Sequence, residues 1–202
     1  MEKGAIFPLF YLPTVEYFSK LLLHKPDIVI EIHEHFPKQT FRNRASIYSP
    51  NGKLDLIVPI VRGSKNHTAF KDVKICYEFN WQRIHWMSLE TCYRSSAFFE
   101  YYEDDFAIFY NKKFEFLFDF NNEILNLLLR LTKLKIDYSF TSEYEKEAVH
   151  LVDYRNTMKP NTVPTTLAKN YYQIFEDKHG FMPNLSVIDI LFNQGPQTLS
   201  YL

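Results

Sequence analysis

The sequence predicts an α/β protein with a mixed central sheet that starts with a β-α-β unit and a β-hairpin and is covered by about five helices. Three observations support this class. Apolar residues alternate with a period of two in residues 27–36 and 44–61. From residue 80 their spacing changes to that of helices. Between two alternating runs, Asn51 and Gly52 form a pair that is typical of hairpin turns.

The first three elements form the β-α-β unit. The apolar residues 5–10 predict a strand, and residues 15–24 have apolar side chains at helical spacing. Residues 27–36 alternate between isoleucines and more polar residues, which predicts a second strand with one buried face.

The hairpin follows in residues 44–61. Two alternating runs flank Pro50, Asn51 and Gly52, and asparagine and glycine both tolerate the positive φ angles of tight turns. Residues 73–77 (VKICY) predict one further strand.

Three helices come next in the chain. Residues 80–94 carry a stripe of apolar side chains with Asn80 as a candidate cap, and His85 lies in the middle of this stripe. The second helix covers residues 97–110. The third is expected to begin at Asn121, with leucines at helical spacing behind it.

The C-terminal part mixes loops with short elements. Residues 135–144 predict a strand and a turn, and residues 154–166 predict a long polar loop with two prolines. Loops of this length are often functional. A helix is expected over residues 167–179.

A last short helix has clear start and stop signals. Asn184 and Ser186 are candidate caps, and Gly195 ends the helix. Asp189 and Asn193 are one turn apart, so they share a face that we expect to anchor this helix to the rest of the chain.

We interpret residues 1–202 as a single domain. Its expected parts are a β-rich part over about residues 1–79, a helical part over about residues 80–135, and a C-terminal extension over about residues 145–202 that docks on them.

Composition narrows the classes of function. The net charge is −1 with both signs mixed along the chain, which disfavours nucleic acid as a partner. No uninterrupted apolar stretch is long enough for membrane insertion, and no secretory leader is visible, so we expect a cytoplasmic protein. Cys76 and Cys92 lack the close spacing of metal-binding pairs and are expected to be reduced core thiols.

A basic cluster follows the second predicted strand. Lys38, Arg42 and Arg44 lie where ligands commonly bind in open α/β sheets, and Asn43 adds an amide between the arginines. Arginine can hold a phosphate or carboxylate through two parallel hydrogen bonds. The cluster therefore indicates either an anion-binding site or an ordinary solvated loop.

Two histidines precede this cluster. On a strand, His33 and His35 would share a face with Glu31, and His85 could supply a third nitrogen to a metal ion. The sequence shows no further ligands at metal-site spacing, so a polar strand edge is the favoured interpretation and His33 and His35 are only weak metal candidates.

Five stretches of the chain together resemble the WbqC-like protein family of bacteria, in the branch found in Bacteroidetes-type species. These stretches are YLPTVEYF, KQTFRNR, NGKLDLIVPI, HWMSLETCYRSSAFFEYY and GFMPNLSVIDILFNQGP. The resemblance implies a link to gene clusters for O-antigen and related surface polysaccharides, and transfer of glycine or another aminoacyl group.

The resemblance also bears on His85 and Tyr93. The family is similar in having a histidine and a tyrosine at these positions, which implies a general base and its assistant. From the residue pattern alone, His85 is either a core histidine, which the pattern favours, or a cleft residue that moves protons near neutral pH. The predicted function is an acyl or aminoacyl transferase acting on a sugar or metabolite intermediate, with an anionic or nucleotide-linked substrate. The alternative is a non-catalytic module that binds an anionic metabolite or a partner protein. The sequence indicates no cofactor and no oligomeric state.

Overall fold

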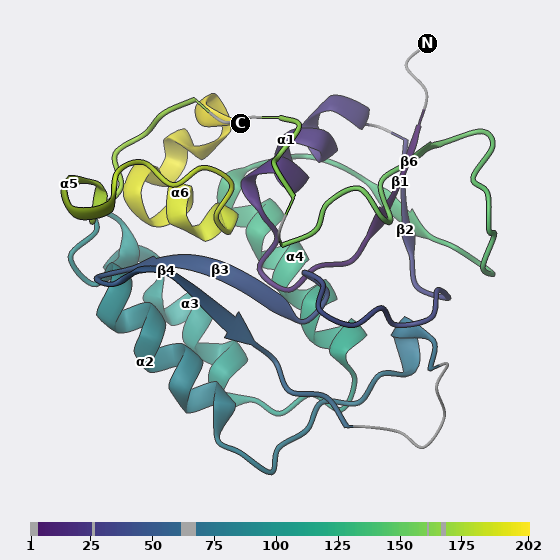
Figure 1. Ribbon diagram of the computed structural model, residues 1–202, viewed down its shortest axis with the longest axis horizontal. Coiled ribbons are helices and arrows are strands. Elements are labelled where there is room, and N and C mark those ends of the chain that lie inside the picture. The colour runs from purple at the N-terminus through teal and green to yellow at the C-terminus, as the bar shows by residue number, and fades with distance from the viewer. Residues whose placement is uncertain (1–3, 26, 62–67, 161, 167–168) are drawn as a thin grey trace.

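The computed structural model describes residues 4–25, 27–61, 68–160, 162–166 and 169–202 (Figure 1). It confirms the predicted α/β class: a four-stranded parallel sheet of order β5-β2-β1-β6 and an antiparallel β3-β4 hairpin lie among the helices. The elements in chain order are β1 (Ala5–Pro8), α1 (Val15–His24), β2 (Ile28–Glu31), β3 (Arg44–Ser49), β4 (Gly52–Ile57), η1 (Phe70–Asp72), α2 (Trp81–Tyr93), α3 (Phe99–Asn111), α4 (Leu117–Thr132), β5 (Tyr138–Phe140), β6 (Val152–Asp153), α5 (Glu176–His179), α6 (Val187–Gln194) and η2 (Gly195–Tyr201).

The β-α-β unit forms as the sequence predicts. Strand β1 is buried along its whole length and pairs in parallel with β2, with Ala5 opposite Ile28. Helix α1 begins after Thr14, whose hydroxyl accepts a hydrogen bond from the Tyr17 N–H at 3.3 Å. This cap satisfies one of the backbone donors that every helix start leaves open.

Strand β2 is shorter than predicted because its last side chain turns the backbone. Oε1 of Glu31 accepts hydrogen bonds from the backbone N–H groups of His33 (2.7 Å) and Glu34 (3.2 Å). A side chain that binds the N–H groups following it offers the chain an alternative to the sheet ladder. His33 and His35 therefore lie beyond the strand, and the expected placement of these two histidines on one strand face was wrong.

The predicted hairpin is confirmed, with Pro50 and Asn51 between the two strands. Gly52 alone among the turn residues has a positive φ, at +96°. The further strand predicted at residues 73–77 was wrong. Those residues form only isolated bridges, Ile60 with Ile75 and Lys74 with Phe116, because neighbouring residues pair with two different segments.

The three predicted helices are present, but the third, α4, begins at Leu117 rather than at Asn121. Asn121 lies inside the helix, fully buried, and its Nδ2 donates to the carbonyl of Arg42 at 2.7 Å. An asparagine that binds a distant backbone group cannot be told from a capping asparagine in the sequence, because both precede an apolar run.

The last helix, α6, forms as predicted and packs against the helical part through Phe192. The Phe192 ring lies 5.1 Å from Tyr93, 5.2 Å from Phe99 and 5.1 Å from Phe106, measured between ring centroids. Ser186 caps α6, with its hydroxyl 3.5 Å from the Ile188 N–H.

Asn184 caps a different helix. Its Oδ1 accepts from the N–H of Glu16 in α1 at 2.9 Å. The start of α6 is further tied to α1 by the backbone bond from Val15 N–H to the Leu185 carbonyl at 2.9 Å, and Figure 1 shows the yellow C-terminal segment beside α1.

The helix expected over residues 167–179 was wrong except for its end. Only α5 (Glu176–His179) is helical, and residues 167 and 168 lie outside the described ranges. Tyr171 and Gln173 both direct their side chains to Asp189. Residues two apart share a face in extended chain and not in a helix, so this shared partner is incompatible with the predicted helix.

Among the described residues, we find no helix with the length and apolar character needed to cross a membrane.

Candidate functional site

Charged side chains gather where the parallel strands β2 and β6 end. We call this group the edge cluster; it consists of Glu31, Glu34, Arg42, Asp153 and Arg155. The carboxyl ends of parallel strands share one edge of a sheet, and open α/β proteins usually bind ligands there.

Arg42 is the centre of one half of the edge cluster. Its Nε donates to Glu34 Oε1 at 2.6 Å and its Nη2 to Glu34 Oε2 at 2.8 Å, in a two-point ion pair. Nη2 also donates to the Arg155 carbonyl at 3.0 Å. Burial raises the pKa of the Glu34 carboxyl, while the Arg42 charge lowers it. Both side chains are buried, so the guanidinium faces protein and not solvent.

Arg155 holds the other half together. Nη1 lies 3.2 Å from Glu31 Oε2, and Nη2 lies 2.6 Å from Asp153 Oδ2. Nη1 also donates to the Glu145 carbonyl at 2.6 Å. The edge cluster therefore joins the loops that follow β2, β5 and β6, and it acts first as a structural clamp.

The predicted anion-binding residues have separate surroundings. Arg44 pairs with Asp55 at 3.5 Å, and Asn43 Nδ2 donates to the Val58 carbonyl at 2.9 Å. Lys38 is exposed on the loop after β2. Of the four predicted residues, the structure brings only Arg42 into the edge cluster, where a carboxylate already fills the position that an anion would take.

The two weak metal candidates both lie after the end of β2. His33 is half-buried and His35 is exposed. Across the part of the chain that the structure describes, no three histidine, cysteine, aspartate or glutamate side chains are grouped so that they could hold a metal ion.

His85 lies in an aromatic core. Its Nδ1 is 3.0 Å from the Tyr11 hydroxyl, which is 2.9 Å from the Tyr110 hydroxyl, and the rings of Tyr11 and His85 are stacked. Only 4% of the residue is exposed. Burial lowers the pKa of His85 to about 4, and a hydrogen bond with the Ile57 backbone opposes this shift. The ring is therefore neutral at pH 7.

Tyr93 belongs to a different network, around the buried carboxylate of Asp189. Its hydroxyl donates to Asp189 Oδ1 at 2.8 Å and accepts from the Tyr48 N–H at 3.2 Å. Oδ2 of Asp189 accepts from the Tyr171 hydroxyl (2.7 Å) and from Gln173 Nε2 (2.8 Å). Burial raises the pKa of Asp189, and these three donors oppose the shift. Asp189 thus anchors α6 to α2, as its position on the predicted helix face indicated.

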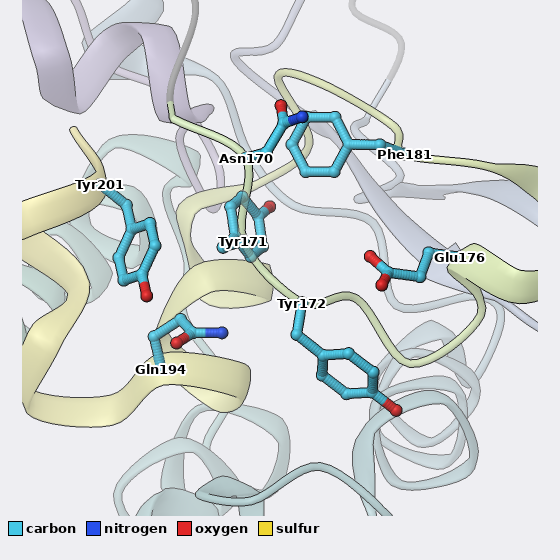
Figure 2. A pocket seen from close by; sticks show the side chains of 7 residues that line it. All are labelled: Asn170, Tyr171, Tyr172, Glu176, Phe181, Gln194 and Tyr201. Carbon is cyan, nitrogen blue, oxygen red and sulfur yellow. The ribbon is translucent and has the colours of Figure 1, made fainter.

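This network borders a pocket of about 440 Å³ that we call the tyrosine pocket. Its lining residues are Asn170, Tyr171, Tyr172, Glu176, Phe181, Gln194 and Tyr201 (Figure 2). It combines aromatic rings with two amides and one carboxylate, which is typical of sites for small polar organic ligands. The sequence predicted a helix here and not a pocket, although the pair Tyr171-Tyr172 beside Asn170 is a usable signal.

A second hollow, of about 670 Å³, lies by the amino ends of β2 and β5. Lys25, Lys135, Ile136 and Asp137 line it. Its cations are on exposed residues, and no aromatic ring is among its described lining residues. The tyrosine pocket is therefore the stronger candidate.

A comparison with known protein families shows to which family this chain belongs. A model of the WbqC-like protein family matches residues 10–174, which is well over half of the sequence. The chain belongs to the WbqC-like protein family. Among its relatives is the uncharacterised protein Rv1507c of Mycobacterium tuberculosis (strain ATCC 25618 / H37Rv), which is 23% identical over 233 residues covering 100% of this chain and 98% of that protein. No solved structure matches the chain significantly.

The family match and the site overlap in part. In this WbqC-like protein, residues 10–174 contain the whole edge cluster, His85 and Tyr93, together with Asn170, Tyr171 and Tyr172 of the tyrosine pocket. The other four lining residues follow the matched region. The pocket thus forms where the family-matched region meets the C-terminal segment.

Proposed function

We propose that this WbqC-like protein binds a sugar, or a closely related polyhydroxylated metabolite, in the tyrosine pocket. In this proposal the bound sugar is the acceptor of an acyl or aminoacyl group during surface-polysaccharide synthesis in the cytoplasm. The observation that carries the binding step is the lining itself, with four aromatic rings, two amides and one carboxylate around one recess.

Sugar chemistry matches such a lining. The C–H faces of a sugar ring are apolar and stack on aromatic rings, while its hydroxyls need both donors and acceptors. The amides of Asn170 and Gln194 can donate and accept, and the Glu176 carboxylate accepts only. Figure 2 shows Gln194 and the Tyr201 hydroxyl close together on one side of the pocket and Glu176 on the other.

The transfer step is supported by the family resemblance rather than by the geometry around His85. A general base must reach the proton that it removes, and the His85 ring is enclosed by aromatic side chains. One observation favours a second candidate function, a non-catalytic sugar-binding module. Glu176 is the single carboxylate among the described lining residues, so the pocket offers no pair of carboxylates to share general acid and general base roles.

Ligand-induced thermal stabilisation tests the binding step. A ligand that binds only the folded state raises the apparent stability by mass action. We expect a panel of monosaccharides and sugar nucleotides to contain at least one compound that raises the melting temperature. Replacing Tyr172 by Ala should remove that shift, because its ring lines the pocket. The substitution should cost little folding stability, because the residue is 59% exposed.

Tyr101→Ala is the matched control, since Tyr101 is 78% exposed on α3 and does not line the pocket. A stabilising sugar whose effect survives Tyr172→Ala binds elsewhere, and a panel without any stabilising sugar contradicts the proposal. Product analysis with acyl donors then separates the transferase from the non-catalytic module.

A further inference from the structure

The charge in the lining of the tyrosine pocket is negative. No lysine, arginine or histidine is among the described residues that line it, and Glu176 is its single carboxylate. A ligand with a negative group would meet this carboxylate without a compensating cation, whereas a ligand with a positive group would be paired.

The Glu176 carboxylate is positioned to form such a pair. Its Oε2 accepts from the Gln173 N–H at 3.1 Å, which fixes the side chain across the turn before α5. Figure 2 shows the two carboxylate oxygens of Glu176 directed toward the side of the pocket where Tyr171 and Tyr172 lie. A carboxylate held by one backbone bond still has acceptor positions for a second donor.

The aromatic rings add a second attraction for positive charge. The Tyr171 ring packs edge-on against Phe181 at 5.4 Å and against Tyr201 at 6.0 Å, between ring centroids. Aromatic faces carry partial negative charge, and ammonium groups bind to several such faces at once in many recognition sites. Rings and carboxylate around one recess are therefore complementary to an ammonium group.

Basic side chains lie near the pocket in sequence but not in its lining. Lys169, Lys178 and His179 are basic side chains of the neighbouring segments, all exposed and none of them lining the pocket. Lys169 directs its Nζ to the Ser200 carbonyl at 2.8 Å. Asp177, next to Glu176, is an exposed acid.

We infer that the tyrosine pocket selects a ligand with a protonated amino group, an amino sugar in its simplest form, over the neutral analogue. This inference rests on the proposed function, in which the pocket binds a sugar, and it names the chemical class of that sugar. An acceptor amine would also be the group that accepts an acyl chain. Before transfer, the ammonium group gives one proton to water. The free amine then attacks the acyl carbon, the bond from that carbon to the donor's leaving group breaks as the amide bond forms, and the leaving group takes up the second amine proton.

The test compares three probes that differ at one position: glucosamine, N-acetylglucosamine and glucose. Titration calorimetry on the full chain should show glucosamine binding at least about tenfold more tightly than either neutral sugar, since hydrogen bonds to charged groups are the strong ones. The preference should weaken at high salt and as the pH rises through the pKa of the amine, because both changes remove the charge attraction.

The variant Glu176→Gln keeps an oxygen for the Gln173 N–H and removes the charge. We expect it to lower glucosamine affinity about tenfold more than glucose affinity, so that the preference of the pocket for glucosamine disappears. Asp177→Asn is the matched control, since it removes the neighbouring charge outside the pocket, and it should change glucosamine affinity less than about threefold.

The outcomes separate the two proposals. Equal affinity of the wild-type protein for glucosamine and glucose overturns the inference and leaves sugar binding intact. Failure of all three sugars to bind overturns the inference, and the proposed function then stands or falls with the thermal-stabilisation panel. The wild-type comparison decides both cases even if Glu176→Gln does not fold.

Discussion

The Tyr171 hydroxyl lies 2.7 Å from Oδ2 of Asp189, so a wall of the tyrosine pocket is in direct contact with the buried carboxylate of α6. Asp189 also binds Tyr93 in α2 at 2.8 Å. A single fully buried carboxylate therefore joins the pocket, the last helix and the helical part of the chain. The position of the pocket therefore depends on the hydrogen bonds to Asp189, and a bound ligand does not have to contact Asp189.

The first prediction concerns this contact. Tyr171→Phe keeps the ring in the pocket and removes one of the three donors to Asp189, so we expect a loss of about 1–3 kcal/mol in the free energy of unfolding. Urea unfolding at pH 7 measures it. Tyr201→Phe removes a hydroxyl from the same pocket without touching Asp189 and should stay within about 0.5 kcal/mol of wild type. Equal losses in the two variants would contradict the role of Asp189.

The second prediction concerns the pH dependence of Asp189. Burial raises its pKa in the folded state above the unfolded value of about 3.9. The folded state then holds the proton more tightly, so the stabilising contribution is complete below the unfolded pKa and is lost as the pH rises through the folded pKa.

Asp189→Asn removes this titration. The difference in unfolding free energy, wild type minus variant, should therefore decrease as the pH is raised from 3.5 toward 7. Urea unfolding of both proteins at matched pH values measures this difference. The other carboxylates contribute equally to the stability of both proteins, so their contribution cancels. A difference that increases with pH would show that the charged form is favoured by folding.

The fold was predictable where short-range signals decide it. The Asn51-Gly52 pair identified the hairpin, and the apolar stripe through His85 and Leu89 identified α2. Both features depend on residues within a few positions of one another. The elements that such short-range patterns predict also form in the folded chain, because tertiary contacts stabilise the same local structure.

The failures have long-range causes. Residues 171–173 are extended because Asp189, 16 or more positions later, takes both Tyr171 and Gln173 as donors. Asn121 resembled a cap, although its amide binds Arg42, 79 positions earlier. Helical spacing and capping signals are local and do not include such distant partners. The non-helical segment around Tyr171, which lines the tyrosine pocket, was therefore predicted wrongly.

Arg42 illustrates the same limit for the candidate site. The sequence identified it as a residue able to hold a carboxylate, and in the fold it holds the carboxylate of Glu34. That an arginine can bind a carboxylate follows from its residue type. Which carboxylate it binds depends on the turn that Glu31 imposes after β2.

The third prediction separates the two arginines of this segment. Arg42→Met leaves the buried Glu34 carboxylate without its partner and should cost about 3–5 kcal/mol of unfolding free energy. Arg44→Met breaks a partly exposed pair with Asp55 and should cost at most about 1 kcal/mol. Chemical denaturation at pH 7 measures both.

A double-mutant cycle checks the cause of the Arg42 effect. Adding Glu34→Gln to Arg42→Met removes the stranded charge, so the double variant should be more stable than Arg42→Met alone. If the two substitutions are additive, the cost of Arg42→Met comes from lost packing and not from the buried carboxylate.

The last prediction concerns His85 and acid. Its pKa is about 4 in the folded protein because the ring is buried, against about 6.5 for an exposed histidine. A depressed folded pKa means that the unfolded state binds the proton first. The stabilisation is complete above pH 6.5 and is lost as the pH falls toward 4, by about 3 kcal/mol in total.

His85→Gln cannot titrate, so the stability advantage of wild type over this variant should shrink by about that amount between pH 7 and pH 4. Urea unfolding across this range measures the advantage; a constant value would mean that the folded protein does not resist protonation of His85.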